Sequence, residues 1–465
     1  MRIAYLVAGA GSMYCGSCLQ ANTLATALRA AGQDCILAPL YTPIRTDEDS
    51  VSIDRVMLGG INLYVQQRWA LFRRTPWLFD RLFDHPGLLR RMAGRSQGIR
   101  PEHLGELTVS VLEGEAGRQR KEVEKLVQWL DREVHPEVVH LSTVLLAGLV
   151  RQIAERLGVP VLCSLSGEDS FLERLPEPHR SRAWEILRQR AGEATALVAM
   201  NGYYADFMAG RLAVPRPRIH VVPPGLNLEG HGTRQGLSQF SQQEAAKMGL
   251  SPSAHHNDRQ PLICIGYLAR VCPDKGLNTL ALALRQLAED AAAPPVGVRA
   301  AGYLDPADRP YLAKIVDEMA ASGLSDRFEY VGELDRPQKI AFLQQCDLFA
   351  LPTSHPESKG LSVFEAWANA VPAVLPAHGA FPEMVADTGG GVLYAPNDPA
   401  GLAAGLKRLI LDPKFANDCG RRAQQAVRER YNNQKAAERM IEVYQACRNF
   451  KSSMSPNSSP PGPSR

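Results

Sequence analysis

The chain has 465 residues. At about 150 residues per domain, or about 200–250 for a large α/β domain, that length predicts two large domains or three smaller ones. A balance of 52 Lys and Arg against 49 Asp and Glu gives a net charge of +3, which argues against a nucleic-acid backbone as the main partner. Nine scattered cysteines exclude a disulfide scaffold, and the absence of any apolar run of about 18 residues excludes a membrane transporter. The first twelve residues, MRIAYLVAGAGS, predict a strand and a turn rather than a secretion signal, so we expect a cytoplasmic protein.

Short apolar runs alternate with helical patterns along most of the chain, which is typical of parallel sheets covered by helices. The strands expected in the first half are residues 3–8, 34–40, 138–141, 159–165, 196–199 and 219–222. Those expected in the second half are residues 262–266, 296–301, 327–331, 348–351, 373–375 and 392–394. The chain is therefore predicted to be an α/β protein with two doubly wound, Rossmann-like domains.

Composition sets the expected boundaries. Residues 230–261 are polar and rich in Gln, Ser, His and Gly, which is typical of a linker. The C-terminal tail is rich in Ser and Pro. The predicted parts are a first domain at 1–229, a linker or insertion at 230–260, a second domain at 261–430, a C-terminal helix at 431–450 and a disordered tail at 451–465. Ligands of open parallel sheets bind at the carboxyl ends of the strands, so we expect the functional residues in the strand-to-helix turns.

The first such turn runs from Gly9 to Cys18 and is rich in small residues. It departs from the G-x-G-x-x-G pattern of dinucleotide folds, but its backbone amides can still approach an anion at the following helix. Cys15 and Cys18 lie in the same loop, and a redox or metal-binding module built on this pair is one functional alternative. Because no second Cys/His pair follows at zinc spacing, we favour a packing role and expect no metal site.

The strongest signal follows the strand at 348–351. Glu357 lies in the loop, and Glu365 lies eight residues later in the next helix. Carboxylates suit sugar hydroxyls, because each oxygen accepts hydrogen bonds from neighbouring O–H groups. The backbone N–H groups of Ser358, Lys359, Gly360 and Leu361 open that helix and are expected to meet a phosphate.

A complementary signal follows the strand at 262–266. Arg270 and Lys275 occupy a strand-to-helix turn at the same end of the predicted sheet. Each alone has an ordinary explanation as a surface ion pair or helix cap. Together they offset the two negative charges of a diphosphate leaving group, so the four side chains predict a site for a nucleotide-diphosphate sugar.

This part of the chain resembles the retaining glycosyltransferases of family 4, the glycosyl transferases group 1, which have the GT-B fold of two facing Rossmann-like domains. The resemblance rests on Arg270 and Lys275, five residues apart, on the Glu-x7-Glu pair of Glu357 and Glu365, and on the Gly-x-x-Pro-Glu turn that starts at Gly379. Residues 221–227 also resemble the segment that enters the linker in this family. The resemblance covers the whole second half, and the first half only in outline.

The resemblance implies that Glu365 holds the ribose of the donor and that Glu357 holds the hydroxyls of its sugar. Arg270 and Lys275 would stabilise the departing diphosphate, and Gly16 would line the site from the first domain. It also implies transfer without a metal cofactor, with the nucleotide-diphosphate sugar as co-substrate. A nucleotide-sugar epimerase of the same fold is the alternative enzyme class.

Three departures from the family pattern concern specificity. Lys359 replaces an aromatic residue beside the sugar, and the cysteine pair is not a general family feature. The turn after the fourth strand has no histidine and holds Glu168 and Asp169, which either orient an acceptor hydroxyl or cap a helix.

Acceptor recognition is expected from the first domain, with a glycan, a lipid or a small molecule as acceptor and no nucleic acid. Residues 68–95, from Arg68 to Arg95, hold seven arginines and five aromatic residues. We favour an amphipathic helical pair for this segment; the alternative is peripheral contact with the inner face of a membrane.

Overall fold

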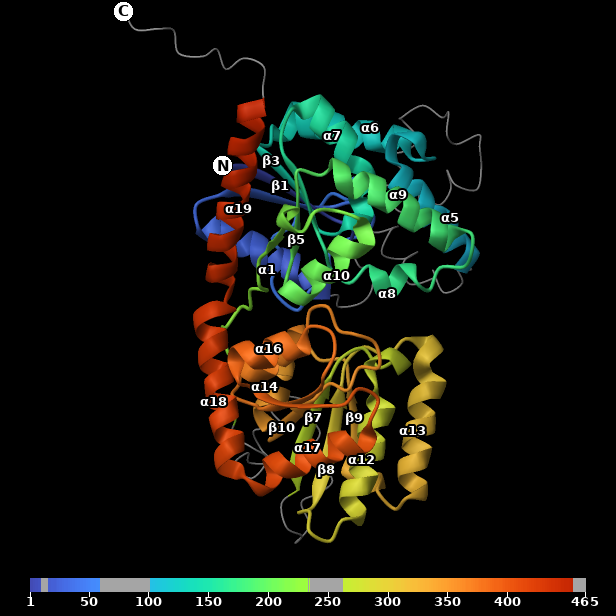
Figure 1. Cartoon of the computed structure of the whole chain (residues 1–465), viewed down its shortest axis with the longest axis vertical. Coiled ribbons are helices and arrows are strands. Elements are labelled where there is room, and N and C mark those ends of the chain that lie inside the picture. The colour runs from blue at the N-terminus through green and yellow to red at the C-terminus, as the bar shows by residue number, and fades with distance from the viewer. Residues whose placement is uncertain (10–15, 59–100, 233, 235–261, 455–465) are drawn as a thin grey trace, which may run out of the picture. The chain divides into compact units, whose positions relative to one another are not determined.

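The computed structural model describes residues 1–9, 16–58, 101–232, 234 and 262–454. The chain divides into two compact units (Figure 1). One comprises Met1–Gly225 together with Gln434–Arg465, and the other comprises Leu226–Asn433. Residues 68–95, for which we favoured an amphipathic helical pair over membrane contact, and residues 235–260 of the predicted linker lie outside the described residues.

The first unit is built on a six-stranded parallel sheet in the order β2-β1-β3-β4-β5-β6. Its strands are β1 (Arg2–Val7), β2 (Asp34–Pro39), β3 (Val138–Leu141), β4 (Val161–Ser164), β5 (Ala196–Ala199) and β6 (Ile219–Val221). In register, Ile3 faces Cys35 on one side and Val138 on the other. Its helices are α1 (Gly16–Ala30), α5 (Pro101–Glu113), α6 (Arg120–Trp129), α7 (Val150–Leu157), α8 (Asp169–Leu172), α9 (His179–Glu193) and α10 (Gly202–Leu212).

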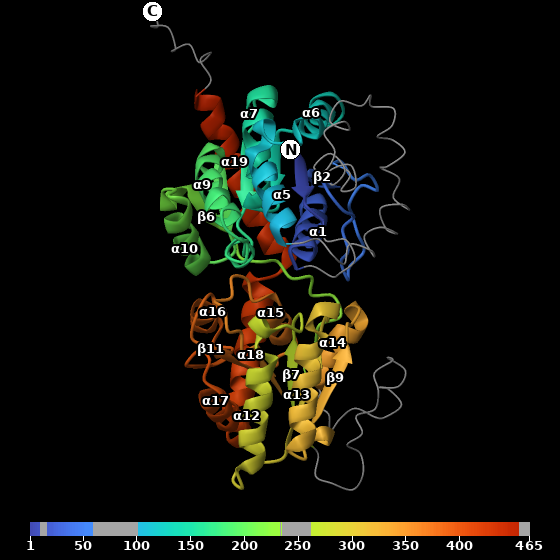
Figure 2. The same ribbon diagram turned by 90° about the vertical axis from the view of Figure 1, so that its right-hand side faces the viewer.

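The second unit has a parallel sheet in the order β12-β11-β10-β7-β8-β9. Figure 2 labels three of these strands, β11, β7 and β9. Its strands are β7 (Ile263–Leu268), β8 (Val296–Ala301), β9 (Phe328–Gly332), β10 (Leu348–Ala350), β11 (Ala373–Pro376) and β12 (Gly391–Tyr394). Its helices are α12 (Leu277–Glu289), α13 (Arg309–Ala321), α14 (Arg336–Gln345), α15 (Leu361–Ala368), α16 (Phe381–Thr388), α17 (Pro399–Leu411) and α18 (Pro413–Arg430). Within the described residues all twelve expected strands are present, so the prediction of two doubly wound α/β domains is confirmed.

Side chains on the two faces of the first sheet enter two separate apolar cores. Ile3 and Tyr5 pack with α1, whereas Ala4 and Leu6 pack with α6, α7, α9 and α10. This division follows from the alternation of side chains along a strand. A sheet that is buried on both faces needs nearly continuous apolar strands, which is the pattern in the sequence.

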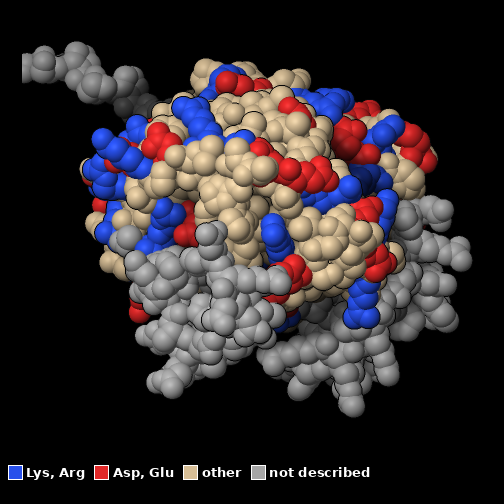
Figure 3. All heavy atoms as spheres, turned by 90° about the horizontal axis from the view of Figure 1, so that it is seen from below, with Lys and Arg blue, Asp and Glu red and all other residues tan. Residues whose placement is uncertain are grey.

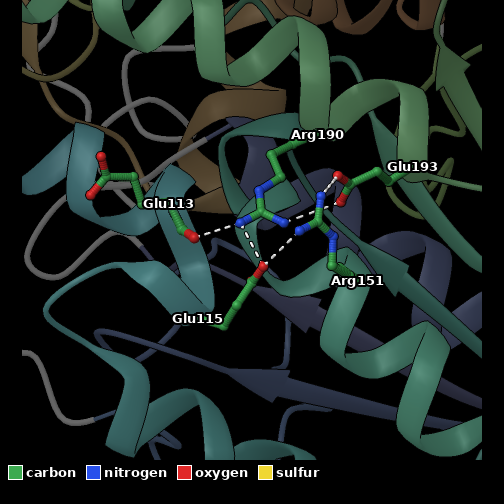
Figure 4. Close-up of polar contacts among 5 residues, drawn as sticks. All are labelled: Glu113, Glu115, Arg151, Arg190 and Glu193. Atoms are coloured by element: carbon green, nitrogen blue, oxygen red, sulfur yellow. Dashed lines mark hydrogen bonds and ion pairs between the residues drawn. The ribbon is translucent and has the colours of Figure 1, made fainter.

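A cluster of arginines and glutamates fixes the helices on one face of the first sheet (Figure 4). Arg190 of α9, with only 6% of its side chain exposed, donates to the backbone oxygen of Glu113 at 2.6 Å and to Glu115 at 2.9 Å. Arg151 of α7 also pairs with Glu115, and both arginines pair with Glu193. The buried guanidinium is therefore compensated, and the end of α5 is held against α7 and α9.

The last helix, α19 (Asn433–Met454), packs on the first unit beside β1 and β3 (Figure 1). Its buried stripe is Ala437, Met440, Val443, Tyr444 and Cys447. The helix ends at Met454, four residues beyond the expected end, so the segment predicted to be tail is helical at 451–454. The rest of that segment, residues 455–465, lies outside the described residues.

A buried hydrogen-bond chain fastens α19 to the sheet. The Tyr444 hydroxyl lies 2.7 Å from His140 Nδ1, and His140 Nε2 lies 2.8 Å from Ser164 Oγ. The His140 ring also stacks on Tyr5, with ring centroids 4.5 Å apart. Burial lowers the pKa of His140 to about 3, so this imidazole stays neutral and serves as a polar joint inside an apolar core.

Surface charges of both signs are mixed on the face drawn in Figure 3. Lys and Arg lie there among Asp, Glu and neutral side chains. In the described part of the chain, no helix is both long enough and apolar enough to cross a membrane.

Candidate functional site

Two strand-to-helix turns of the second unit pack against each other at the carboxyl ends of neighbouring strands β7 and β10. The N–H of Ser354 donates to the backbone oxygen of Asp274 at 3.0 Å. Gly276 has φ +70°, and a Cβ at this position would lie 1.8 Å from the backbone oxygen of Pro352. Only glycine fits this contact, and it brings the turn that carries Lys275 beside the loop that carries Glu357.

Lys275 and Glu357 form an ion pair. The distance from Lys275 Nζ to Glu357 Oε2 is 2.5 Å, with 30% of the lysine side chain and 10% of the glutamate side chain exposed. Burial alone would raise the pKa of Glu357, but Lys275 and the N–H of Lys359 outweigh it and lower the pKa to about 2. The carboxylate is therefore ionised across the physiological range and can accept hydrogen bonds from hydroxyl groups.

The backbone N–H groups that precede α15 bind a carboxylate of the protein itself, the side chain of Glu357. The N–H groups of Ser358 and Lys359 both donate to Glu357 Oε1 at 3.2 Å. Gly360 then adopts a left-handed conformation with φ +65°, and Leu361 begins the helix. We expected these four amides to meet a phosphate. In the structure, two of them orient the carboxylate that faces Lys275.

Arg270 lies in the same turn as Lys275, just after β7. Its side chain is exposed, and its backbone oxygen accepts a hydrogen bond from the hydroxyl of the buried Tyr267 at 3.3 Å. The N–H of Val271 is bound by the backbone oxygen of Tyr303 after β8. A fixed backbone at an exposed position suits Arg270 to bind an anion.

Glu365, which the sequence grouped with Glu357, is buried in an ion pair of its own. It is 5% exposed, and its Oε1 lies 2.5 Å from Nζ of Lys339, which is 7% exposed and comes from α14. Lys339 was missed at the sequence level. The available signal was its helical spacing, because it shares one face of α14 with Phe342 and Leu343, where an apolar residue is expected.

A third turn, after β11, completes the surroundings of Glu357 and was also missed as part of the site. A Cβ on Gly379, which has φ +61°, would lie 2.4 Å from the backbone nitrogen of Glu357. The N–H of Ala380 donates to the backbone oxygen of Glu357 at 2.8 Å. His378 Nε2 lies 3.2 Å from Thr353 Oγ1, and burial lowers the pKa of this histidine. Gly379, the first residue of the Gly-x-x-Pro-Glu motif, therefore lies in close contact with the backbone of Glu357.

The predicted residues of the first unit have simpler surroundings. Gly16 is exposed and is the first residue of α1. Cys15 lies outside the described residues, whereas Cys18 is 2% exposed and packs in the core between α1 and the sheet. Such burial disfavours the reactive thiolate that a redox module needs.

Glu168 and Asp169 are both buried after β4. Glu168 accepts hydrogen bonds from Thr143 Oγ1 at 2.6 Å and from the N–H of Ser166 at 2.7 Å, while Asp169 accepts one from the Tyr204 hydroxyl at 2.8 Å. The capping interpretation is wrong for Glu168, because its side chain makes no cap hydrogen bond to α8. It orders the preceding loop instead. In the part of the chain that the structure describes, no group of three His, Cys, Asp or Glu residues is arranged to hold a metal ion.

Two family models match the chain. The model for Glycosyl transferases group 1 matches residues 253–426, and the model for Glycosyltransferase Family 4 matches residues 100–229. The first spans Arg270, Lys275, Glu357 and Glu365, so the second unit carries the group 1 match and the first unit carries the family 4 match.

Similar curated proteins include a D-inositol 3-phosphate glycosyltransferase and a glycogen synthase. The chain is 29% identical to D-inositol 3-phosphate glycosyltransferase of Salinispora arenicola over 380 residues, covering 76% of this chain and 80% of the relative. It is 26% identical to glycogen synthase of Mycobacterium tuberculosis over 327 residues, covering 68% of this chain and 70% of the relative.

Among solved structures, sucrose-phosphate synthase from Thermosynechococcus elongatus superposes with a TM-score of 0.68 at 18% identity, covering 97% of this chain and all of the neighbour. The Anabaena protein HepE in complex with UDP superposes with a TM-score of 0.66 at 16% identity, covering 96% of this chain and all of the neighbour. At these identities the likeness shows the fold, which is GT-B.

Proposed function

Because the chain belongs to the group 1 glycosyltransferases of the family 4 type, we propose that it is a retaining, metal-independent hexosyltransferase that uses a nucleotide-diphosphate sugar. The observation that carries this proposal is the ion pair of Lys275 and Glu357 at the ends of β7 and β10. An ionised carboxylate for sugar hydroxyls and a cation for a diphosphate meet there on two rigid turns.

The two cations act on the leaving group. Transfer breaks the bond between the anomeric carbon and the diphosphate oxygen, so negative charge grows on that oxygen. An ammonium has three donors, so Lys275 can keep its contact with Glu357 and still reach a phosphate oxygen. Arg270, exposed in the same turn, supplies the second positive charge. Two cations in one turn offset the charge that a divalent metal offsets in other enzymes, so no metal cofactor is required.

Retention follows from attack on the face that the leaving group vacates. The acceptor hydroxyl forms the new bond to the anomeric carbon as the old bond breaks, and its proton passes to the departing phosphate oxygen. Glu357 holds the sugar during this exchange, Glu365 holds the ribose, and the amides of Gly360 and Leu361 line the donor.

We propose UDP-sugars as the first donors to test, because the similar HepE structure contains UDP. The acceptor is a polyhydroxylated glycan, lipid headgroup or small molecule, in keeping with the inositol phosphate and glycogen named for the relatives. We place the reaction in the cytoplasm, where the buried thiols of the described cysteines remain reduced.

The test is calorimetric binding of UDP, GDP and ADP, followed by turnover of the matching nucleotide sugars with simple polyol acceptors. Binding and turnover should persist in EDTA, and NMR of the product should show the anomeric configuration of the donor. Activity that requires Mg²⁺ or Mn²⁺ would refute the metal-independent site. Conversion of the donor to its epimer without an acceptor would instead identify an epimerase.

A further inference from the structure

We propose that Lys339 is a positioning residue for the nucleotide of the donor: it holds the Glu365 carboxylate in the orientation that receives the ribose hydroxyls. This inference rests on the proposed function, which assigns the ribose to Glu365. It adds a residue from a different helix, α14, that lies outside the Arg–Lys and Glu-x7-Glu motifs.

Lys339 and Glu365 form a buried ion pair. Lys339 Nζ lies 2.5 Å from Glu365 Oε1, with 9% of the lysine side chain and 7% of the glutamate side chain exposed. A buried carboxylate is costly unless a partner compensates its charge, and the ammonium of Lys339 supplies that compensation. A carboxylate has about four lone-pair directions, so one carboxylate can bind an ammonium and hydroxyl groups together.

Hydrogen bonds hold the two helices that carry this pair, α14 and α15, in place. A capping box fixes the start of α14, with the N–H of Gln338 donating to Asp335 Oδ1 at 3.0 Å and the N–H of Asp335 donating to Gln338 Oε1 at 3.2 Å. From the first turn of α14, Arg336 donates to the backbone oxygens of Asn227 at 2.9 Å and Glu229 at 2.8 Å. The helix that presents Lys339 is therefore anchored to the segment by which the chain enters the second unit.

The helix that presents Glu365 is anchored to the same segment. Asn369 ends α15, and its Nδ2 lies 3.0 Å from the backbone oxygen of Glu365 and 2.9 Å from His231 Nδ1. Its Oδ1 accepts a hydrogen bond from the N–H of Gly232 at 3.1 Å. Residues 227–232 therefore contact both helices, and these contacts hold α14 and α15 together at the level of the Lys339–Glu365 pair.

Lys339 differs from Lys275, the lysine of the other ion pair of the site, in its position and exposure. Lys275 sits in a turn and is 30% exposed, which suits direct contact with the diphosphate. Lys339 sits within a helix and is 7% exposed, which suits action through Glu365. The two lysines consequently affect different steps, with Lys275 acting on the charge that develops during transfer and Lys339 acting on donor binding.

The experiment compares Lys339→Met, Lys339→Arg, Glu365→Gln and the double variant Lys339→Met/Glu365→Gln. Lys407→Met is the matched control, because Lys407 forms a lysine–carboxylate pair with Asp290 in the same unit. The readouts are the Kd for UDP by calorimetry, the KM and kcat for the nucleotide sugar that the wild type uses, and the melting temperature.

Lys339→Met should raise the Kd for UDP and the donor KM by about 10- to 100-fold, because the buried Glu365 carboxylate loses the positive charge that positions it, with kcat close to that of the wild type. Lys339→Arg should restore most of the affinity, and Lys407→Met should match the wild type. Because Lys339 acts through Glu365, the double variant should bind UDP no more weakly than Glu365→Gln alone.

Two results would overturn the inference while leaving the proposed function intact: a folded Lys339→Met variant with wild-type Kd and KM, or a double variant whose loss exceeds that of Glu365→Gln. If Lys339→Met does not fold, Lys339→Arg and the double variant, in which both charges are removed, decide the question by the same comparisons. A wild-type protein that binds none of UDP, GDP and ADP would overturn the proposed function together with this role.

Discussion

Replacing Glu357 by Gln should weaken the second unit in a manner that depends on pH. Lys275 and the amide of Lys359 hold the pKa of Glu357 at about 2, below its ordinary value of 4.5. A carboxyl group whose pKa is lower in the folded state stabilises the fold above its unfolded pKa, and that stabilisation is lost as the pH falls through the folded value. Glutamine keeps the shape of the side chain and removes the charge, so this contribution disappears.

The size of the effect follows from the pKa. A fall from 4.5 to about 2 corresponds to about 3 kcal/mol of stability at neutral pH. Linkage places most of the loss in the acid range, so the difference between wild type and Glu357→Gln should shrink by about 2 kcal/mol between pH 6 and pH 3. With only 10% of its side chain exposed, Glu357 is poorly screened by solvent.

Urea unfolding at the two pH values measures this difference. Trp367 is buried in α15 and is the only tryptophan in the sequence between residues 226 and 433, so its fluorescence reports on the second unit. Asp290→Asn is the control, because the pair of Asp290 with Lys407 is more exposed and should contribute much less. Equal differences at pH 6 and pH 3 would show that Lys275 does not hold Glu357 in the ionised form, and the reasoning would fail.

The other predictions concern turnover and the C-terminal helix. Arg270→Ala and Lys275→Ala should each lower kcat about 10²–10³-fold, as expected for the loss of one charge-stabilising donor. Steady-state kinetics on the folded variants measure this, and a wild-type kcat in both would show that the two cations have only a structural role. Glu365→Gln should raise the donor KM more than it lowers kcat, and the same kinetics would contradict that role if only kcat changed. Tyr444→Phe leaves Nδ1 of the buried His140 without its hydroxyl partner and should lower the free energy of unfolding of the first unit by about 1–3 kcal/mol. An unchanged urea midpoint would show that this hydrogen bond contributes nothing.

The strands were predictable because each is a short apolar run that has to be buried on both faces. The run at 196–199 coincides with β5, and even the three-residue strand β10 was expected within one residue. Local pattern suffices here because parallel sheets covered by helices make almost continuous hydrophobic strands.

The meeting of Lys275 and Glu357 was predictable for a related reason. Arg270, Lys275 and Glu357 follow strands directly, and parallel strands end at one edge of a sheet. Their spacing in the sequence is therefore enough to bring Lys275 and Glu357 together, although they lie 82 positions apart.

What the sequence by itself determined is thus the order of strands and helices and the turns that carry the charged side chains, since both depend on residues close together in the chain. Only the tertiary structure decided which charges meet inside the second unit. Lys339 pairs with Glu365 because α14 and α15 pack side by side. Tertiary packing also assigned α19 to the first unit through Tyr444 and His140, which are separated by 304 positions. An amphipathic stripe shows that a helix will be buried, but the surface that buries it is chosen by shape and by buried polar partners from distant parts of the chain.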